Sequence, residues 1–112
     1  MADHFIWEGA SGKKYNYSVH KFHLSFKDDP VGNYIFCKFV KGEWVPIYIG
    51  EGIINDRKED EEHKTCALGK GVTHIHAHKN SIEENRCAEE QDLLAAHPEA
   101  YDPIGCNVKP KG

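Results

Sequence analysis

Apolar and β-branched residues concentrate in two short segments near the middle of the chain, residues 32–36 and 46–50. The polar turn Lys41-Gly42-Glu43 separates them, which predicts a β-hairpin. Each outer end of the hairpin has a tyrosine in a triplet that contains glycine, Gly32-Asn33-Tyr34 at one end and Tyr48-Ile49-Gly50 at the other. Antiparallel strands bring these ends side by side, so both phenol groups are expected to reach one region of space. The glycines would let a backbone segment or a ligand approach closely.

The segment before the hairpin predicts one further strand. Apolar positions alternate over residues 15–19 and, in the opposite register, over residues 22–26. This pattern indicates one long edge strand that bends at His20-Lys21 and ends in a turn over residues 27–30. Residues 9–14 are polar and rich in glycine, which predicts a loop.

Two patterns follow the hairpin. Asn55 is expected to cap a short, mostly solvated helix from Asp56 to about Lys64. Strict alternation over residues 72–78 predicts a third core strand, which places Val72 and the histidines on one face.

The last predicted element is a second helix. Ser81 and Glu84 form a capping box, and the helix should run to about Ala96, before His97-Pro98. Strands and helices in this order predict one small α/β (α+β) domain. It would have an antiparallel or mixed β-sheet with a three-stranded core, flanking helices and an extra N-terminal strand.

Composition narrows the class of protein. A chain of 112 residues with 39% hydrophobic residues is expected to fold as one domain. No apolar run is long enough for a membrane span, and the N-terminus lacks the pattern of a secretory signal, so a cytoplasmic location is expected. The four cysteines form no C-x-x-C pair and are expected to be reduced thiols, some of them buried. A net charge of −4 argues against nonspecific coating of nucleic acid, although a locally positive cleft is compatible with it.

Glu90 is the most informative single residue. On a helix it lies near Leu93, Leu94 and Cys87, which places a carboxylate among apolar neighbours. There it must be protonated, paired or bound to a cation. The alternative is an ion pair with Arg86 or simple exposure, and Glu89 is expected to face outward more.

The ordered set Tyr34, Tyr48, Arg57, Glu90 and Asn107 resembles the recurring functional residues of the GIY-YIG nuclease family. The resemblance covers residues 32–107, which leaves residues 1–31 as an N-terminal extension and 108–112 as a tail. It implies a central three-stranded antiparallel sheet with helices packed against it.

The resemblance also implies roles for these residues. Glu90 corresponds to the family's single ligand for a divalent metal, for which Mg²⁺ or Mn²⁺ is expected. Tyr34 would be the general base and Tyr48 a hydrogen-bonding partner, whereas the alternative for both is packing in the sheet. Arg57 would hold phosphate oxygens. Asn107 would hold the helix end or a substrate phosphate, with a plain turn residue as the alternative.

The sequence departs from the family pattern near Arg57. Arg57 follows Gly50 by seven residues and Lys58 by eight, where the family's arginine usually stands, so either residue is a candidate for the phosphate contact. The acidic run over residues 59–62 would repel substrate unless it forms a solvated face, which is the interpretation favoured here. Asn33 replaces the apolar middle residue of the first triplet and needs partners if it is buried.

The histidines allow a different interpretation. His74, His76 and His78 share a face, and His63 and Cys66 lie just upstream, so two of the row with one of these are candidate zinc ligands. Residues four apart on a strand are about 13 Å apart, too far to share one ion. His63 stands where the family often has a histidine near the site, which makes it a candidate for proton transfer.

The sequence therefore predicts a divalent-metal-dependent endonuclease acting on nucleic acid, DNA being favoured over RNA. One alternative is a catalytically weak or inactive nucleic-acid-binding module on the same scaffold. A His/Cys metal-binding protein is the other. A recruiting protein partner is compatible with the negative charge, and no membrane partner is expected.

Overall fold

Strand β3 (Val31–Val40) lies between two antiparallel partners. It pairs with β4 (Glu43–Ile53) across the predicted turn and with β5 (His74–Lys79) on its other side. The structure, a computed structural model, describes residues 3–109. Residues 110–112 of the predicted tail lie outside this range. The hairpin, the three-stranded antiparallel core and the α+β fold class are confirmed.

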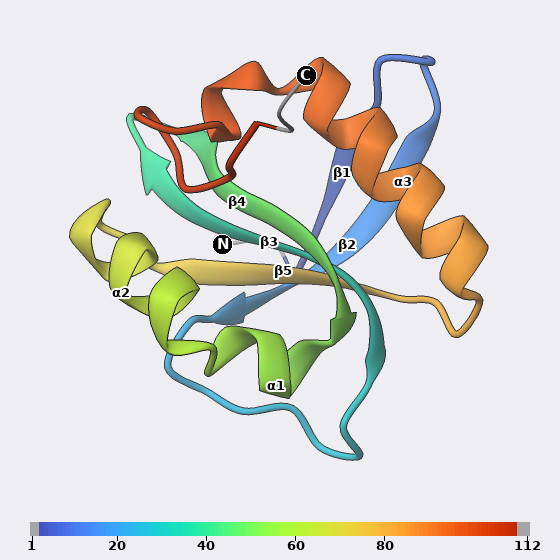
Figure 1. Cartoon of the computed structure of the whole chain (residues 1–112), viewed down its shortest axis with the longest axis horizontal. Helices are drawn as coiled ribbons and strands as arrows, with labels where there is room; N and C mark the ends of the chain where they lie inside the picture. The colour runs from blue at the N-terminus through green and yellow to red at the C-terminus, as the bar shows by residue number, and fades with distance from the viewer. Residues whose placement is uncertain (1–2, 110–112) are drawn as a thin grey trace.

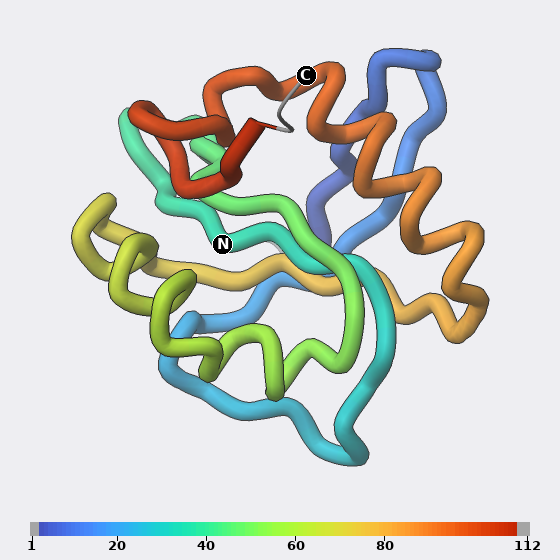
Figure 2. The backbone as a smooth tube through the Cα atoms, viewed as in Figure 1, coloured from blue at the N-terminus to red at the C-terminus, as the bar shows by residue number. Residues whose placement is uncertain are grey.

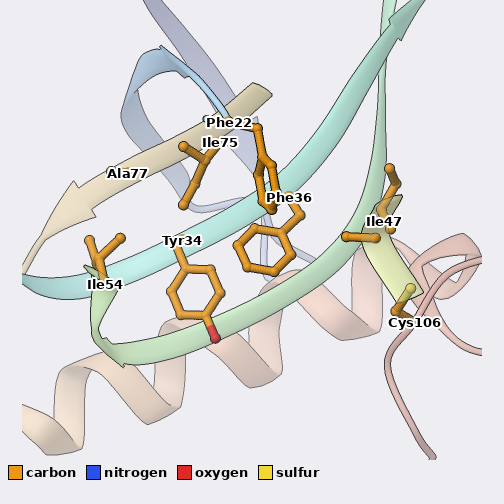
Figure 3. Close-up of a cluster of buried hydrophobic side chains, with 9 residues drawn as sticks. Phe22, Tyr34, Phe36, Ile47, Ile54, Ile75, Ala77 and Cys106 are labelled. Atoms are coloured by element: carbon orange, nitrogen blue, oxygen red, sulfur yellow. The ribbon is translucent and has the colours of Figure 1, made fainter. Parts of the chain in front are cut away.

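Alternate side chains of β3 point to opposite faces of the sheet, and both faces are covered. Tyr34 and Phe36 join the first core cluster, which faces α1 (Ile54–Lys58) and α2 (Glu61–Gly69). Figure 3 shows the two rings side by side in this cluster. Ile35 and Cys37 join the second cluster, which faces α3 (Glu83–Ala96). Burial on both faces explains why β3 reads as a nearly continuous apolar segment.

The N-terminal extension forms two strands, β1 (His4–Glu8) and β2 (Lys14–Lys21), joined by the predicted loop. The sheet order is β1-β2-β5-β3-β4, so β1 and β4 are the edge strands (Figure 1). The segment predicted as an edge strand, β2, is interior. The prediction of one long strand through residue 26 is wrong. β2 ends at Lys21, where the Phe22 ring turns into the first core cluster and packs edge-to-face on Phe36.

The predicted single helix after the hairpin is two helices, because the chain breaks at Glu59 and Asp60. Asp60 caps α2 by accepting a hydrogen bond from the His63 backbone at 3.2 Å. Asn55 is not the predicted cap. Its amide instead bonds both backbone groups of Phe26, which fastens the β2–β3 loop to α1.

Helix α3 ends at Ala96 as predicted, before the short 3₁₀ turn η1 (Pro98–Ala100). Its start differs from the prediction. The helix begins at Glu83, and its N-cap residue Ile82 makes no side-chain capping bond, so the capping box at Ser81 is wrong. No helix within residues 3–109 is both long and apolar enough to span a bilayer.

The C-terminal segment folds back over β4 (Figure 2), where the Cys106 backbone donates to the Ile47 carbonyl. A disulfide joins Cys106 to Cys66 of α2. The expectation of four reduced thiols is therefore wrong for this pair. Cys37 is buried and Cys87 is exposed, and both are free thiols.

Candidate functional site

Tyr34 and Tyr48 lie together where β3 meets β4. Their rings are nearly parallel, with centroids 6.0 Å apart, so the predicted shared region of space is confirmed. A Cβ atom at Gly50 would lie 2.5 Å from the Tyr34 hydroxyl oxygen, so only glycine leaves room for this phenol. A Cβ atom at Gly32 would lie 2.2 Å from the His78 carbonyl oxygen. Glycine is therefore needed in the first triplet because the backbone of β5 passes close to it.

The two tyrosines differ in their access to solvent. Tyr34 is 1% exposed, whereas Tyr48 is half-buried. Burial raises the pKa of Tyr34 well above its usual value, and the neighbouring Tyr48 adds to the shift while Arg57 opposes it. Burial and then the Glu90 carboxylate also raise the pKa of Tyr48. Both phenols are therefore neutral at pH 7, and Tyr48 presents the more accessible hydroxyl.

A hollow of about 300 Å³ opens beside Tyr48 at the β4 edge of the sheet. Three predicted residues line it together with Tyr48, namely His63 from α2, Glu90 from α3 and Asn107 from the C-terminal segment. Its remaining lining residues are Gln91, Leu94, Tyr101 and Val108.

Glu90 is half-buried at the side of this hollow. Burial raises its pKa, the neighbouring Glu51 carboxylate raises it further, and Arg57 opposes both. The alternative ion pair with Arg86 is wrong, because the Arg86 Nε atom donates to Glu51 at 2.9 Å. Within residues 3–109 no cationic side chain lies within salt-bridge distance of Glu90. Glu90 is thus a desolvated carboxylate without an ion-pair partner among residues 3–109, and sequence reasoning did not anticipate the contribution of Glu51.

Arg57 and Lys58 point to different surroundings, although they are adjacent in α1. Lys58 is 2% exposed, and its ammonium group donates to the Leu24 carbonyl at 2.9 Å. Arg57 is exposed and packs beside Gly52, where its charge acts on Tyr34, Tyr48 and Glu90. Of the two candidates for a phosphate contact, Arg57 alone has its charged group available.

His63 stands directly over Tyr48, with ring centroids 4.4 Å apart. Its Nδ1 atom lies 3.4 Å from an Asp60 carboxylate oxygen, and it has no hydrogen-bond partner within the described residues. The imidazole therefore adds an acid–base group to the hollow.

Asn107 is held by β4 rather than left free for a ligand. Its amide oxygen accepts from the Ile49 backbone N–H at 2.8 Å, and its amide nitrogen donates to the Ile49 carbonyl at 3.0 Å. It holds neither a helix end nor an open position for a phosphate. Asn107 instead fixes the strand beside Tyr48 and anchors the C-terminal segment.

The prediction that Glu89 faces outward is wrong. Glu89 is 4% exposed and accepts hydrogen bonds from the Tyr17 hydroxyl and from His78 Nδ1, the latter at 2.9 Å. The helical spacing Arg86, Glu89, Leu93, all buried, is the sequence signal that could have placed it. Asn33 is fully buried, and its amide nitrogen has the partner that burial requires, because it donates to the Arg86 carbonyl at 2.8 Å.

Two of the candidate zinc ligands, His76 and Cys66, are already bonded to other groups. His76 is fully buried and accepts a hydrogen bond from the Trp7 indole at 2.9 Å, and Cys66 is disulfide-bonded. No group of three or more His, Cys, Asp or Glu residues within residues 3–109 is arranged to hold a metal ion. The acidic run over residues 59–62 is exposed, as predicted for a solvated face.

No protein-family model, curated protein or solved structure matches this chain. The chemistry of the hollow is therefore inferred from its residues. Phenol, imidazole and carboxylate groups line it, and a guanidinium group nearby acts on them electrostatically.

Proposed function

We propose that this chain is a GIY-YIG-type endonuclease that hydrolyses phosphodiester bonds in DNA with one Mg²⁺ or Mn²⁺ ion. The supporting observation is Glu90, a half-buried carboxylate at the side of a polar hollow, with a raised pKa and no cationic partner in the described part of the chain. A divalent cation at this carboxylate would offset its desolvation, and a hard oxygen ligand suits Mg²⁺.

Glu90 would be the single protein ligand of the ion, and the ion would supply Lewis-acid stabilisation of the scissile phosphate. Arg57 would bind the non-bridging phosphate oxygens, because its guanidinium group is exposed and has several donors. Lys58 is not proposed for this contact, since its ammonium group already bonds Leu24.

Proton transfer is assigned to the accessible groups. Tyr48 and His63 pack against each other and both line the hollow. The His63 imidazole would accept the proton of the attacking water, and the neutral Tyr48 phenol would orient that water by a hydrogen bond. Tyr34 lies behind Tyr48, and its buried neutral phenol would support the position of Tyr48 rather than contact water directly. This assignment moves the role of general base from Tyr34, where the family resemblance implies it, to His63.

The second candidate is a nucleic-acid-binding module that does not cut. The burial of Tyr34 favours it, because a phenol 1% exposed cannot act as the general base that the family resemblance assigns to this tyrosine. In either case the net charge of −4 makes unaided search along DNA weak, so a recruiting protein partner is part of the proposal.

Nicking of supercoiled plasmid in Mg²⁺ tests the proposal. The wild type should nick DNA, and Glu90→Gln should lower the rate by roughly 100-fold or more, as for other groups that stabilise a transition state directly. Glu84→Gln, at an exposed position of the same helix, is the control and should nick at the wild-type rate. Equal nicking by Glu90→Gln would end the metal assignment, and a gel shift without nicking by the wild type would select the second candidate.

A further inference from the structure

A second hollow, of about 520 Å³, lies between β2, β5 and the loop that joins β2 to β3. Ser18 of β2 and Tyr34 of β3 both pair with Ala77 of β5, so the sheet presents these residues on one face, the face that α1 also covers. None of the residues proposed for cleavage lines this hollow. We call it the β2–β5 hollow.

The β2–β5 hollow is rich in basic groups although the chain is acidic. Among the residues that the structure describes, its lining includes Lys27, Lys79, His4 and His20 but only one carboxylate, that of Asp28. Burial lowers the pKa of His20, and the charges of His4 and Lys79 lower it further. Two lysines face one carboxylate in the described lining, so the local field is positive and attracts anions.

The polar floor of the hollow is ordered by hydrogen bonds. The Ser18 hydroxyl donates to the Ala77 carbonyl at 3.1 Å, and its oxygen lies 2.7 Å from His20 Nε2. Because a hydroxyl has one hydrogen, His20 Nε2 must be the donor in the second contact. The Phe26 ring packs edge-on against His20, with ring centroids 4.6 Å apart. Phe26, which comes from the loop between β2 and β3, forms an aromatic side wall of the hollow.

The wall of the hollow is fastened to the helix that carries Arg57. Asn55 of α1 bonds the Phe26 backbone through both amide atoms and also donates to Asp29 at 2.9 Å. Figure 1 shows this loop running past α1 between β2 and β3. These bonds hold Phe26, which lines the hollow, in a fixed position relative to α1.

We propose that the β2–β5 hollow binds the phosphodiester backbone of nucleic acid. Lys27 and Lys79 contact the phosphates, Ser18 and His20 order the floor, and Phe26 offers a surface on which a base or sugar can pack. The hollow is built largely from the N-terminal extension and the following loop, outside residues 32–107. The proposal rests on nucleic acid being the substrate, and it extends the bound strand away from Glu90.

Fluorescence anisotropy with a labelled 20-base-pair DNA duplex, in EDTA to prevent cleavage, tests the proposal. The double variant Lys27→Ala/Lys79→Ala should bind about tenfold more weakly than wild type. Its slope of log affinity against log salt should also fall by roughly 2, one for each lost phosphate contact. Lys14→Ala/Lys41→Ala removes the same charge at exposed positions outside the hollow and should change affinity less than about twofold.

Equal losses in the two double variants would overturn the proposal, because they would reflect net charge alone. Absence of duplex binding by the wild type, with inorganic phosphate still shifting the His4 and His20 NMR resonances, would also overturn it in favour of a small phosphate ligand. The Glu90→Gln variant distinguishes a failure of the metal assignment from a failure of the binding proposal for the β2–β5 hollow. If that variant still nicks while Lys27→Ala/Lys79→Ala binds weakly, the metal assignment fails and the hollow stands.

Discussion

At the scale of the residue, neighbours in the chain take different roles in this protein. Lys58 is buried and bonds a backbone carbonyl, whereas Arg57 is exposed at Gly52. Glu89 forms a buried network with Tyr17 and His78, whereas Glu90 lines a hollow without an ion-pair partner within residues 3–109. Side-chain direction on each helix therefore separates structural charges from those proposed for chemistry.

Substitutions at Arg57 and Lys58 should affect different properties. Arg57→Ala should lower nicking by roughly 100-fold, because it removes the proposed phosphate contact and the charge that opposes the raised pKa of Glu90. Its stability should be unchanged, because the side chain is exposed. Lys58→Ala should lower the free energy of unfolding by about 1–3 kcal/mol, because it removes a buried side chain and its hydrogen bond to the Leu24 carbonyl. Nicking rates and urea unfolding of both variants check this prediction. A catalytic loss in the Lys58 variant with full stability would reverse the assignment.

At the scale of the element, side chains of two adjacent residues, Cys106 and Asn107, attach the C-terminal segment to the body of the domain. Asn107 bonds both backbone groups of Ile49, and the neighbouring Cys106 is disulfide-bonded to α2. These contacts hold the segment that carries Tyr101 and Val108 against the hollow beside Tyr48.

Replacing Asn107 should therefore affect stability more than chemistry. Asn107→Ala leaves a buried N–H and a buried carbonyl without partners, and should cost about 2–4 kcal/mol in the free energy of unfolding. Asn85→Ala, an exposed position on α3, is the matched control and should change stability by less than about 0.5 kcal/mol. An Asn107 variant that is fully stable yet inactive would show that the amide acts on substrate instead.

Elements with strong local patterns could be predicted from the sequence. The hairpin, strand β5 and the end of α3 follow from alternation, turn residues and a proline. The end of β2 at Lys21 could not, because it depends on Phe22 packing against Phe36, a residue of a later strand. The role of Asn55 likewise could not be predicted, because its amide bonds the distant Phe26 backbone instead of capping a helix.

The candidate site was predictable only in part, for a related reason. Strand and helix geometry places Tyr34, Tyr48 and Glu90 near one another once the fold is known. The choice between Arg57 and Lys58, and the engagement of Asn107, depend on tertiary hydrogen bonds to Leu24 and Ile49. No local sequence pattern encodes these contacts.

At the scale of the whole molecule, several histidines are placed where burial opposes their charged form. Burial lowers the pKa of His76 from its ordinary value of 6.5 to about 3, and it also lowers the pKa values of His20 and His74. Below pH 6.5 the unfolded chain takes up protons that the folded chain does not. The contribution that neutral His76 makes to the free energy of unfolding is therefore fully present above pH 6.5 and is lost as the pH falls toward 3.

The wild type should lose up to about 1.4 kcal/mol per pH unit from His76 between pH 6 and pH 4. His76→Gln should be less stable at pH 7.5, where it disturbs the contact with Trp7, but should show a flatter pH dependence. Urea unfolding at pH 7.5, 6, 5 and 4 measures both slopes. Parallel curves for the two proteins would contradict a buried neutral His76.

The location of a bound divalent ion tests the central claim most directly, independently of nuclease activity. Substoichiometric Mn²⁺ added to ¹⁵N-labelled protein broadens the NMR resonances of nearby amides. We predict that the amides of Tyr48, Glu90 and Gln91 broaden first, and that Glu90→Gln abolishes this effect. Broadening centred on the acidic run over residues 59–62, or unchanged by Glu90→Gln, would contradict a metal site in the hollow beside Tyr48.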